Sequence, residues 1–145
     1  MLPVVVLGGG IGGLAAALAL ARKGRDVRVF EQGAEFKEIG AGIQLGPNVY
    51  RMFQALGLTG AIERYSVHPD NLVMMDAITG DEVIRLKVGA DAFRERFGGF
   101  RYGVIHRGDL HQVLLDACVA EKRIELLTLK TVSYTHLTLP TILRV

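Results

Sequence analysis

Residues 4–13 have the sequence VVVLGGGIGG, which joins a short apolar run directly to a cluster of glycines. The run at residues 4–7 is β-branched and too short for a helix, which predicts a strand buried on both faces of a parallel sheet. Gly8, Gly10 and Gly13 then match the pattern G-x-G-x-x-G. In this pattern the glycines permit a tight turn, the approach of a pyrophosphate, and close helix packing. The stretch therefore predicts a strand, a turn and a helix whose N-terminus faces dinucleotide phosphates.

The residues after the glycines favour this interpretation over a purely structural glycine turn, which is the alternative for an isolated pattern. Residues 14–23 are rich in alanine and leucine, the best helix formers, and Gly24 predicts the end of that helix. Residues 27–30 predict a second strand, and Glu31 follows it directly. A carboxylate at this place predicts an acceptor for ribose hydroxyls, and it would repel a 2′-phosphate.

The composition is that of a soluble globular domain. The chain has 145 residues, of which 50% are hydrophobic and 22% are charged, and its formal net charge is +2. Such a small charge indicates neither a nucleic-acid nor a membrane partner. A single cysteine, Cys118, excludes an internal disulfide framework and favours a reducing, cytoplasmic location. The apolar N-terminus lacks a basic leader and is interrupted by glycines, so we expect neither a targeting segment nor a membrane span.

The middle of the chain predicts a helix followed by a hairpin. A helix is expected over residues 47–57, with an apolar stripe formed by Val49, Met52, Phe53 and Leu56. Residues 72–75 and 83–86 are short apolar runs separated by a glycine-containing turn, which predicts an antiparallel hairpin outside the parallel sheet. We interpret Met74 and Met75 as core residues of this hairpin rather than as ligand contacts.

The last third of the chain predicts a strand, a helix and a strand. Residues 102–107 are expected to be extended, and residues 123–127 to add a strand to the parallel sheet. Between them, residues 109–122 predict a helix whose apolar side consists of Leu110, Val113, Leu114, Ala117 and Cys118. His106 and His111 are five residues apart across the junction with this helix. That is no metal-ligand spacing on one face, so we expect no metal site.

Three motifs, taken in order, resemble the N-terminal part of the single-component FAD-dependent aromatic hydroxylases. They are the glycine motif with Glu31, the sequence EIGAGIQLGPN at residues 38–48, and the sequence IHRGDLH at residues 105–111. The resemblance covers about residues 3–130 and is strongest to the salicylate and 3-hydroxybenzoate 6-hydroxylase group. Position alone leaves two roles open for Arg107, which are contact with a phosphate or flavin and pairing with Asp109 or solvent.

The resemblance implies FAD as cofactor, with NADH or NADPH as electron donor and a small phenolic or aromatic acid and O2 as substrates. It implies that the glycine motif holds the FAD pyrophosphate, that Glu31 binds the adenosine ribose, that Arg107 contacts FAD, and that residues 42–44 lie near the flavin. No catalytic base is assigned. The predicted cofactor-binding residues are Gly8, Gly10, Ile11, Gly12, Gly13, Glu31, Gln32, Gly42, Ile43, Gln44 and Arg107.

We therefore expect a partial FAD-binding domain of the Rossmann-type α/β fold at residues 1–131, in which residues 71–100 begin a substrate-facing β layer. Residues 132–145 resemble nothing in the family and are similar to a translated sequencing-adapter read-through; a divergent threonine-rich strand is the alternative. Activity is expected of a full-length parent and not of these 145 residues. Another flavin oxidoreductase and a non-enzymatic NAD- or FAD-binding module are the alternatives. The oligomeric state is open, with a homodimer among the alternatives.

Overall fold

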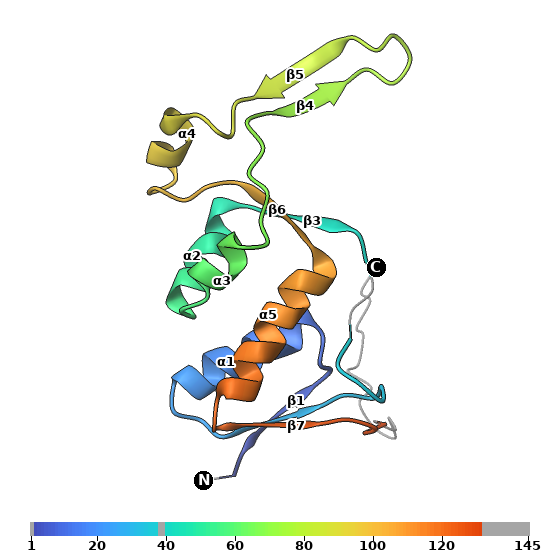
Figure 1. Cartoon of the computed structure of the whole chain (residues 1–145), viewed down its shortest axis with the longest axis vertical. Helices are drawn as coiled ribbons and strands as arrows, with labels where there is room; N and C mark the ends of the chain where they lie inside the picture. The colour runs from blue at the N-terminus through green and yellow to red at the C-terminus, as the bar shows by residue number, and fades with distance from the viewer. Residues whose placement is uncertain (1, 38–39, 132–145) are drawn as a thin grey trace, which may run out of the picture.

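The computed structural model describes residues 2–37 and 40–131. Residues 132–145, predicted to be a non-native tail, and two residues of the second motif, Glu38 and Ile39, lie outside the described residues. Figure 1 shows the elements, which in chain order are β1 (Val4–Leu7), α1 (Ile11–Arg22), β2 (Val27–Phe30), β3 (Gly42–Leu45), α2 (Pro47–Ala55), α3 (Thr59–Glu63), β4 (Leu72–Met75), β5 (Glu82–Leu86), α4 (Asp91–Arg96), β6 (Gly103–His106), α5 (Arg107–Ala120) and β7 (Ile124–Leu127).

A parallel sheet in the order β1-β2-β7 is the centre of the fold. Its register places Val6 beside Val29, and Val29 beside Leu126. Helix α1 connects β1 to β2 and packs on the sheet, and α5 packs against α1 (Figure 1). Helix α1 lies close to the sheet because the side chains between them are small: Ala17 and Ala21 are buried against the strands. The predicted Rossmann-type α/β fold with a parallel sheet is confirmed.

Helix α1 begins directly after the glycine turn. It starts at Ile11, earlier than the predicted residue 14, because Gly12 and Gly13 already form its first turn. Its predicted end is confirmed at Gly24, which has a φ of +78°. This left-handed conformation costs glycine little and stops the helix.

The predicted burial of β1 on both faces is wrong for the described residues. Val5 and Leu7 are each 51% exposed, whereas Val6, on the other face, packs against the core beneath α1. Successive side chains of a strand point to opposite faces of the sheet. Only one face of β1 is therefore covered, because the described residues supply helices on that side alone.

The main core lies between α1, α5 and α2. Leu14 and Leu114 are fully buried there, as is Cys118, whose thiol donates to the Leu14 carbonyl at 3.4 Å. Burial raises the pKa of Cys118 to about 11, which keeps this thiol protonated and unreactive. The predicted stripe on α2 is correct at Phe53 but wrong at Met52, which is 44% exposed beside an open groove between α1 and α2.

Strands β3 and β6 form a separate antiparallel pair that the sequence did not predict as a pair. Gly42 lies opposite His106, and Leu45 lies opposite Gly103. The backbone of Val67 extends this pair through hydrogen bonds with Val104. The pairing brings the second motif beside the start of α5.

The predicted hairpin is confirmed as β4 and β5, which project away from the parallel sheet and from α1 and α5 (Figure 1). Its apolar side chains are exposed, including Met74 at 62% and Met75 at 52%, so their interpretation as core residues is wrong. The reason is that no second layer of the described chain packs on the hairpin. Its role as the start of a substrate-facing layer stays a prediction.

Among residues 2–37 and 40–131, no helix has both the length and the apolar character needed to cross a membrane.

Candidate functional site

The glycine turn joins β1 to α1 at the carboxyl end of the sheet. Gly8 has a φ of +97°, and its N–H donates to the Phe30 carbonyl of β2 at 2.8 Å. A Cβ at Gly13 would collide with the backbone oxygen of Gly8, so only glycine permits this contact between strand and helix. Gly10 is the N-cap of α1, and no side chain caps this end of the helix. The first-turn N–H groups have no intrahelical acceptor, which suits this end for an anion.

Glu31 lies against this turn. Its carboxylate accepts hydrogen bonds from the Gly9 N–H at 2.7 Å and from the Gly33 N–H at 2.8 Å. These bonds, with that of Gly33 the larger cause, hold the pKa of Glu31 below its ordinary value, so the carboxylate is ionised at neutral pH. The backbone of Glu31 also pairs with the end of β7 and the chain after it, through bonds with Leu127 and Lys130. Because a carboxylate has about four acceptor positions, Glu31 keeps capacity for further donors.

Gly9 is a part of the site that the sequence pattern missed, because it occupies an unspecified position of G-x-G-x-x-G. It is buried, and a Cβ added to it would overlap the Phe36 ring. Its carbonyl accepts a hydrogen bond of 2.8 Å from Nε2 of His111 on α5, a side chain that is only 2% exposed. His111 was missed as well, although it ends the third motif. The signal that could have found it is its spacing of four residues from Arg107.

The predicted flavin-side residues form the second part of the site. Arg107 is the first residue of α5, whereas the sequence placed it just before the helix. The backbone N–H of Arg107 donates to the Ala41 carbonyl at 3.2 Å. A Cβ added to Gly40 would lie 2.6 Å from Cδ of the Arg107 side chain. Strand β3, which contains Gly42, Ile43 and Gln44, continues from there.

Helix α5 connects the two parts of the site. Arg107 and His111 are four residues apart on this helix, so they share one of its faces. The first contacts the segment before β3 and the second contacts the glycine turn. Of the predicted residues, Gln32 alone is placed apart, as an exposed side chain in the loop after Glu31. The structure thus gathers Gly8, Gly10, Ile11, Gly12, Gly13 and Glu31 at the turn, and Gly42, Ile43, Gln44 and Arg107 at β3 and the start of α5.

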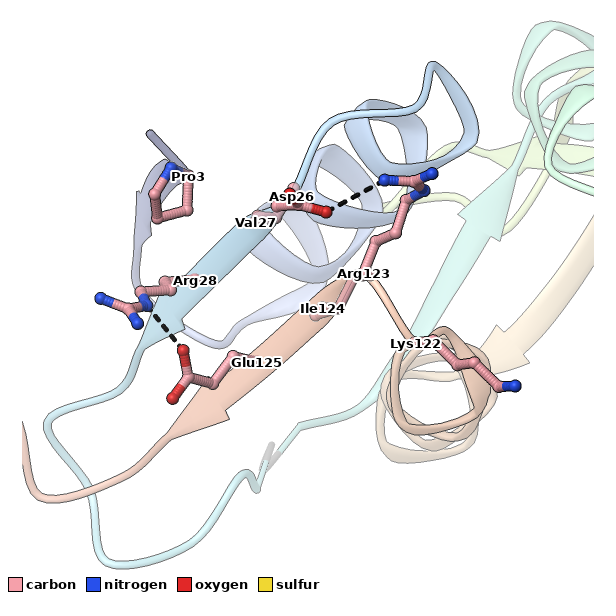
Figure 2. Close-up of a pocket in the computed structure, with 8 residues that line it drawn as sticks. All are labelled: Pro3, Asp26, Val27, Arg28, Lys122, Arg123, Ile124 and Glu125. Atoms are coloured by element: carbon pink, nitrogen blue, oxygen red, sulfur yellow. Dashed lines mark hydrogen bonds and ion pairs between the residues drawn. The ribbon is translucent and has the colours of Figure 1, made fainter. Parts of the chain in front are cut away.

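Figure 2 shows a different hollow, of about 310 Å³, at the amino ends of the strands. Four of its charged groups pair with one another, Arg28 with Glu125 at 2.6 Å and Arg123 with Asp26 at 3.1 Å. Parallel α/β sheets bind ligands at the carboxyl ends of their strands. The hollow lies at the opposite end from the glycine turn, so it is not the candidate site.

The histidines have separate structural partners. His106 accepts a hydrogen bond from the Gly108 N–H at 3.2 Å and so caps α5, whereas His111 contacts the glycine turn. Within the described ranges, no cluster of three or more histidine, cysteine, aspartate or glutamate side chains could hold a metal ion.

The chain is similar to known proteins over most of its length. Residues 6–36 match the family model of the NAD(P)-binding Rossmann-like domain. The chain is 54% identical over 127 residues to a 3-hydroxybenzoate 6-hydroxylase of Polaromonas naphthalenivorans (strain CJ2), a match that covers 88% of this chain and 31% of the relative.

Two solved structures of oxygenase or FAD-binding proteins have the same fold. One is a tetrameric 2-methyl-3-hydroxypyridine-5-carboxylic acid oxygenase, with a TM-score of 0.74 and 27% identity over 88% of this chain and 31% of that one. The other is Klebsiella pneumoniae HpxO complexed with FAD and uric acid, with a TM-score of 0.70 and 27% identity over 86% of this chain and 30% of that one.

These matches confirm the resemblance that the three motifs predicted. The chain spans about 31% of the length of the first of these relatives.

Proposed function

We propose that this chain is the FAD-binding portion of an NAD(P)H-dependent flavoprotein monooxygenase. The premise is its relationship to part of the 3-hydroxybenzoate 6-hydroxylases. The proposed substrate of the whole protein is a small phenolic or aromatic acid, with O2 as co-substrate. The names of the relatives support this class of reaction. A cytoplasmic location belongs to the proposal, because NAD(P)H is the electron donor and a lone buried thiol suits a reducing compartment.

The observation that carries the proposal is the contact of the Glu31 carboxylate with the Gly9 N–H at the turn before α1. This contact places an ionised acceptor beside a helix N-terminus that has no side-chain cap. An adenosine diphosphate has the complementary chemistry, since its diphosphate needs N–H donors and its ribose hydroxyls need an acceptor. The residues present therefore fit the adenosine half of FAD.

The chain's own residues have distinct tasks in this proposal. The first turn of α1 would bind the diphosphate, and Glu31 would accept from the ribose hydroxyls. Arg107 and residues 42–44 would line the flavin side, where β3 and the start of α5 already lie together. The flavin, when bound, supplies the redox chemistry of hydroxylation, and the protein supplies binding and orientation.

Nucleotide binding can be tested on the chain itself. Backbone amide spectra recorded during titration with ADP should show shifts at Gly10, Gly12 and Gly13. Adenosine 2′,5′-bisphosphate should bind at least about tenfold more weakly than 5′-AMP, from which it differs only by the 2′-phosphate that meets the ionised Glu31. A folded chain whose glycine amides do not respond to ADP would contradict the proposal. Tighter binding of NAD than of FAD would favour the alternative of an NAD-binding module, which the matched family model supports.

The flavoprotein activity requires a longer protein. The matching 127 residues of the Polaromonas relative can be replaced by those of this chain, since the two are 54% identical. We expect the chimera to purify with FAD and to oxidise NAD(P)H in the presence of 3-hydroxybenzoate. The same chimera with Glu31→Lys should lose FAD. A folded chimera that contains no flavin would contradict the assignment.

A further inference from the structure

Gly9 is held from both sides by side chains that lie far from it in the sequence. Its N–H donates to Oε2 of Glu31 at 2.7 Å, and its carbonyl accepts from Nε2 of His111 at 2.8 Å. Glu31 follows β2, whereas His111 belongs to α5. Both hydrogen-bonding groups of one glycine in the turn are therefore fixed by tertiary contacts.

The contact with His111 also fixes the next N–H along the chain. The peptide between Gly9 and Gly10 is planar and trans, so the Gly9 carbonyl and the Gly10 N–H point in opposite directions. Because the carbonyl points to His111, the Gly10 N–H points away from α5. Gly10 is the second glycine of the motif and the N-cap of α1.

The preceding peptide is fixed by the same logic. The Gly9 N–H points to Glu31, so the Gly8 carbonyl of that peptide points the opposite way, where it packs closely against Gly13. Two successive peptide planes thus have defined orientations. The orientation of the second plane depends on His111.

We propose that His111 is a positioning residue that aims the Gly10 N–H at the dinucleotide phosphate, an inference that rests on the proposed function. A carbonyl only accepts hydrogen bonds, so Nε2 of His111 must carry a proton. The side chain is 2% exposed, so water does not replace this donor when it is removed. Without it, the Gly9 carbonyl is left buried and unpaired, and the peptide plane is released.

Two amide substitutions separate the hydrogen bond from the general effect of losing a buried ring. The amide nitrogen of glutamine reaches the position of Nε2, whereas that of asparagine is shorter and reaches only the position of Nδ1. We therefore expect His111→Gln to preserve the contact with Gly9 and His111→Asn to lose it. The fully buried Leu114→Ala, on the same helix, is the control for lost core packing.

The first measurement is amide hydrogen exchange by NMR on the full chain. In H111N the protection of the Gly9 N–H should fall about tenfold or more, because Gly9 is no longer held on its carbonyl side and its N–H opens more readily from Glu31. The Gly8 N–H, which is bonded to Phe30, is the internal reference and should change no more than the global stability does. H111Q should keep the Gly9 protection of the wild type, and L114A should not lower it selectively.

The second measurement is ADP affinity, which should fall about tenfold in H111N and stay within about twofold of the wild type in H111Q and L114A. The two proposals can fail separately. If H111N selectively loses Gly9 protection but the wild type binds no ADP, the positioning of the turn by His111 is supported and the proposed function is contradicted. Equal Gly9 protection in H111N and wild type would overturn the inference. So would a long-range ¹H–¹⁵N spectrum of the wild type in which only Nδ1 of His111 is protonated, a measurement that requires no variant to fold.

Discussion

Two carboxylates of this protein make the same kind of contact in two different regions. Glu31 accepts from the N–H groups of Gly9 and Gly33, and Asp76 accepts from those of Ile78 and Thr79. These backbone bonds are the largest cause of the lowered pKa in both side chains. The difference is range, because Glu31 joins segments 22 residues apart whereas Asp76 stays within its own turn.

The surroundings of the two regions differ in the same way. At the glycine turn, α1 and α5 bury Leu14, Leu18 and Leu114 completely. At the β4–β5 hairpin, every residue of β5 is exposed, including Ile84 at 48%. The candidate site therefore depends on packing between distant segments, and the hairpin depends on its turn and its strand pairing. Substitutions in the first region should therefore change the free energy of unfolding of the whole domain. Substitutions in the second should change only the local structure of the hairpin.

The strongest way to break the glycine-turn region is Gly13→Ala, because its Cβ would meet the backbone oxygen of Gly8. We expect it to lower the free energy of unfolding by about 4 kcal/mol or more, as measured by urea denaturation. Gly12→Ala is the matched control, since nothing lies within 4 Å of its Cβ. It should leave stability unchanged or raise it by up to about 1 kcal/mol. Similar losses in both variants would contradict this account of the turn.

Truncation of one apolar side chain in each region tests the contrast in packing directly. Leu114→Ala removes a fully buried side chain and should cost about 3 kcal/mol. Ile84→Ala removes a half-exposed one and should change the free energy of unfolding by no more than about 0.5 kcal/mol. Denaturation curves of both variants, recorded under the same conditions, provide the comparison. A loss at Ile84 as large as that at Leu114 would mean that the hairpin is packed in solution.

Glu31→Gln should show a pH-dependent loss of stability. The folded pKa of Glu31 lies below its ordinary value of 4.5, so ionisation stabilises the fold above that pH, and the contribution disappears as pH falls through the folded pKa. We expect a loss of about 1 kcal/mol at pH 7 that shrinks below about pH 4.5, because solvent partly screens this carboxylate. The exposed Glu35→Gln is the control and should change stability by less than about 0.5 kcal/mol at every pH. Parallel pH curves for E31Q and wild type would contradict the prediction.

Asp76→Ala should have the smallest effect. It removes the acceptor for Ile78 and Thr79, so their amide signals should shift and their hydrogen exchange should quicken. The urea midpoint followed at the buried residues of α1 and α5 should not move, because Asp76 makes its contacts inside the turn. A shift of that midpoint would show that the hairpin is coupled to the sheet.

The sequence predicted the features of the site that are set by the local backbone. Gly8 has a left-handed backbone conformation, and Gly13 leaves no room for a Cβ. Because glycine meets both requirements best, the fixed spacing of the glycines in the sequence predicts the turn. The β-branched runs of β1 and β2 are also local, as is the glycine that ends α1 at Gly24. For these reasons the turn, its strands and the placement of Glu31 beside it follow from the order of residues.

The remaining features depend on contacts across the chain, which local patterns do not contain. His111 lies 102 residues from the carbonyl that it contacts, and the pattern leaves the position of Gly9 unspecified. Strand β3 begins with glycine, a poor strand former, and its pairing depends on β6 much later in the chain. The exposure of Met74 and Val5 depends on which layers cover them, and strand periodicity does not say which of two faces is covered.

Helix α5 gives the two parts of the candidate site a common mechanical support. An α-helix rises about 1.5 Å per residue and is stiff over a single turn. A shift of α5 along its axis would therefore disturb the Ala41 contact of Arg107 and the Gly9 contact of His111 together. In the proposed site, a ligand that immobilises His111 would also restrain Arg107, so ordering where the diphosphate is proposed to bind would lower the entropy cost of ordering where the flavin is proposed to bind.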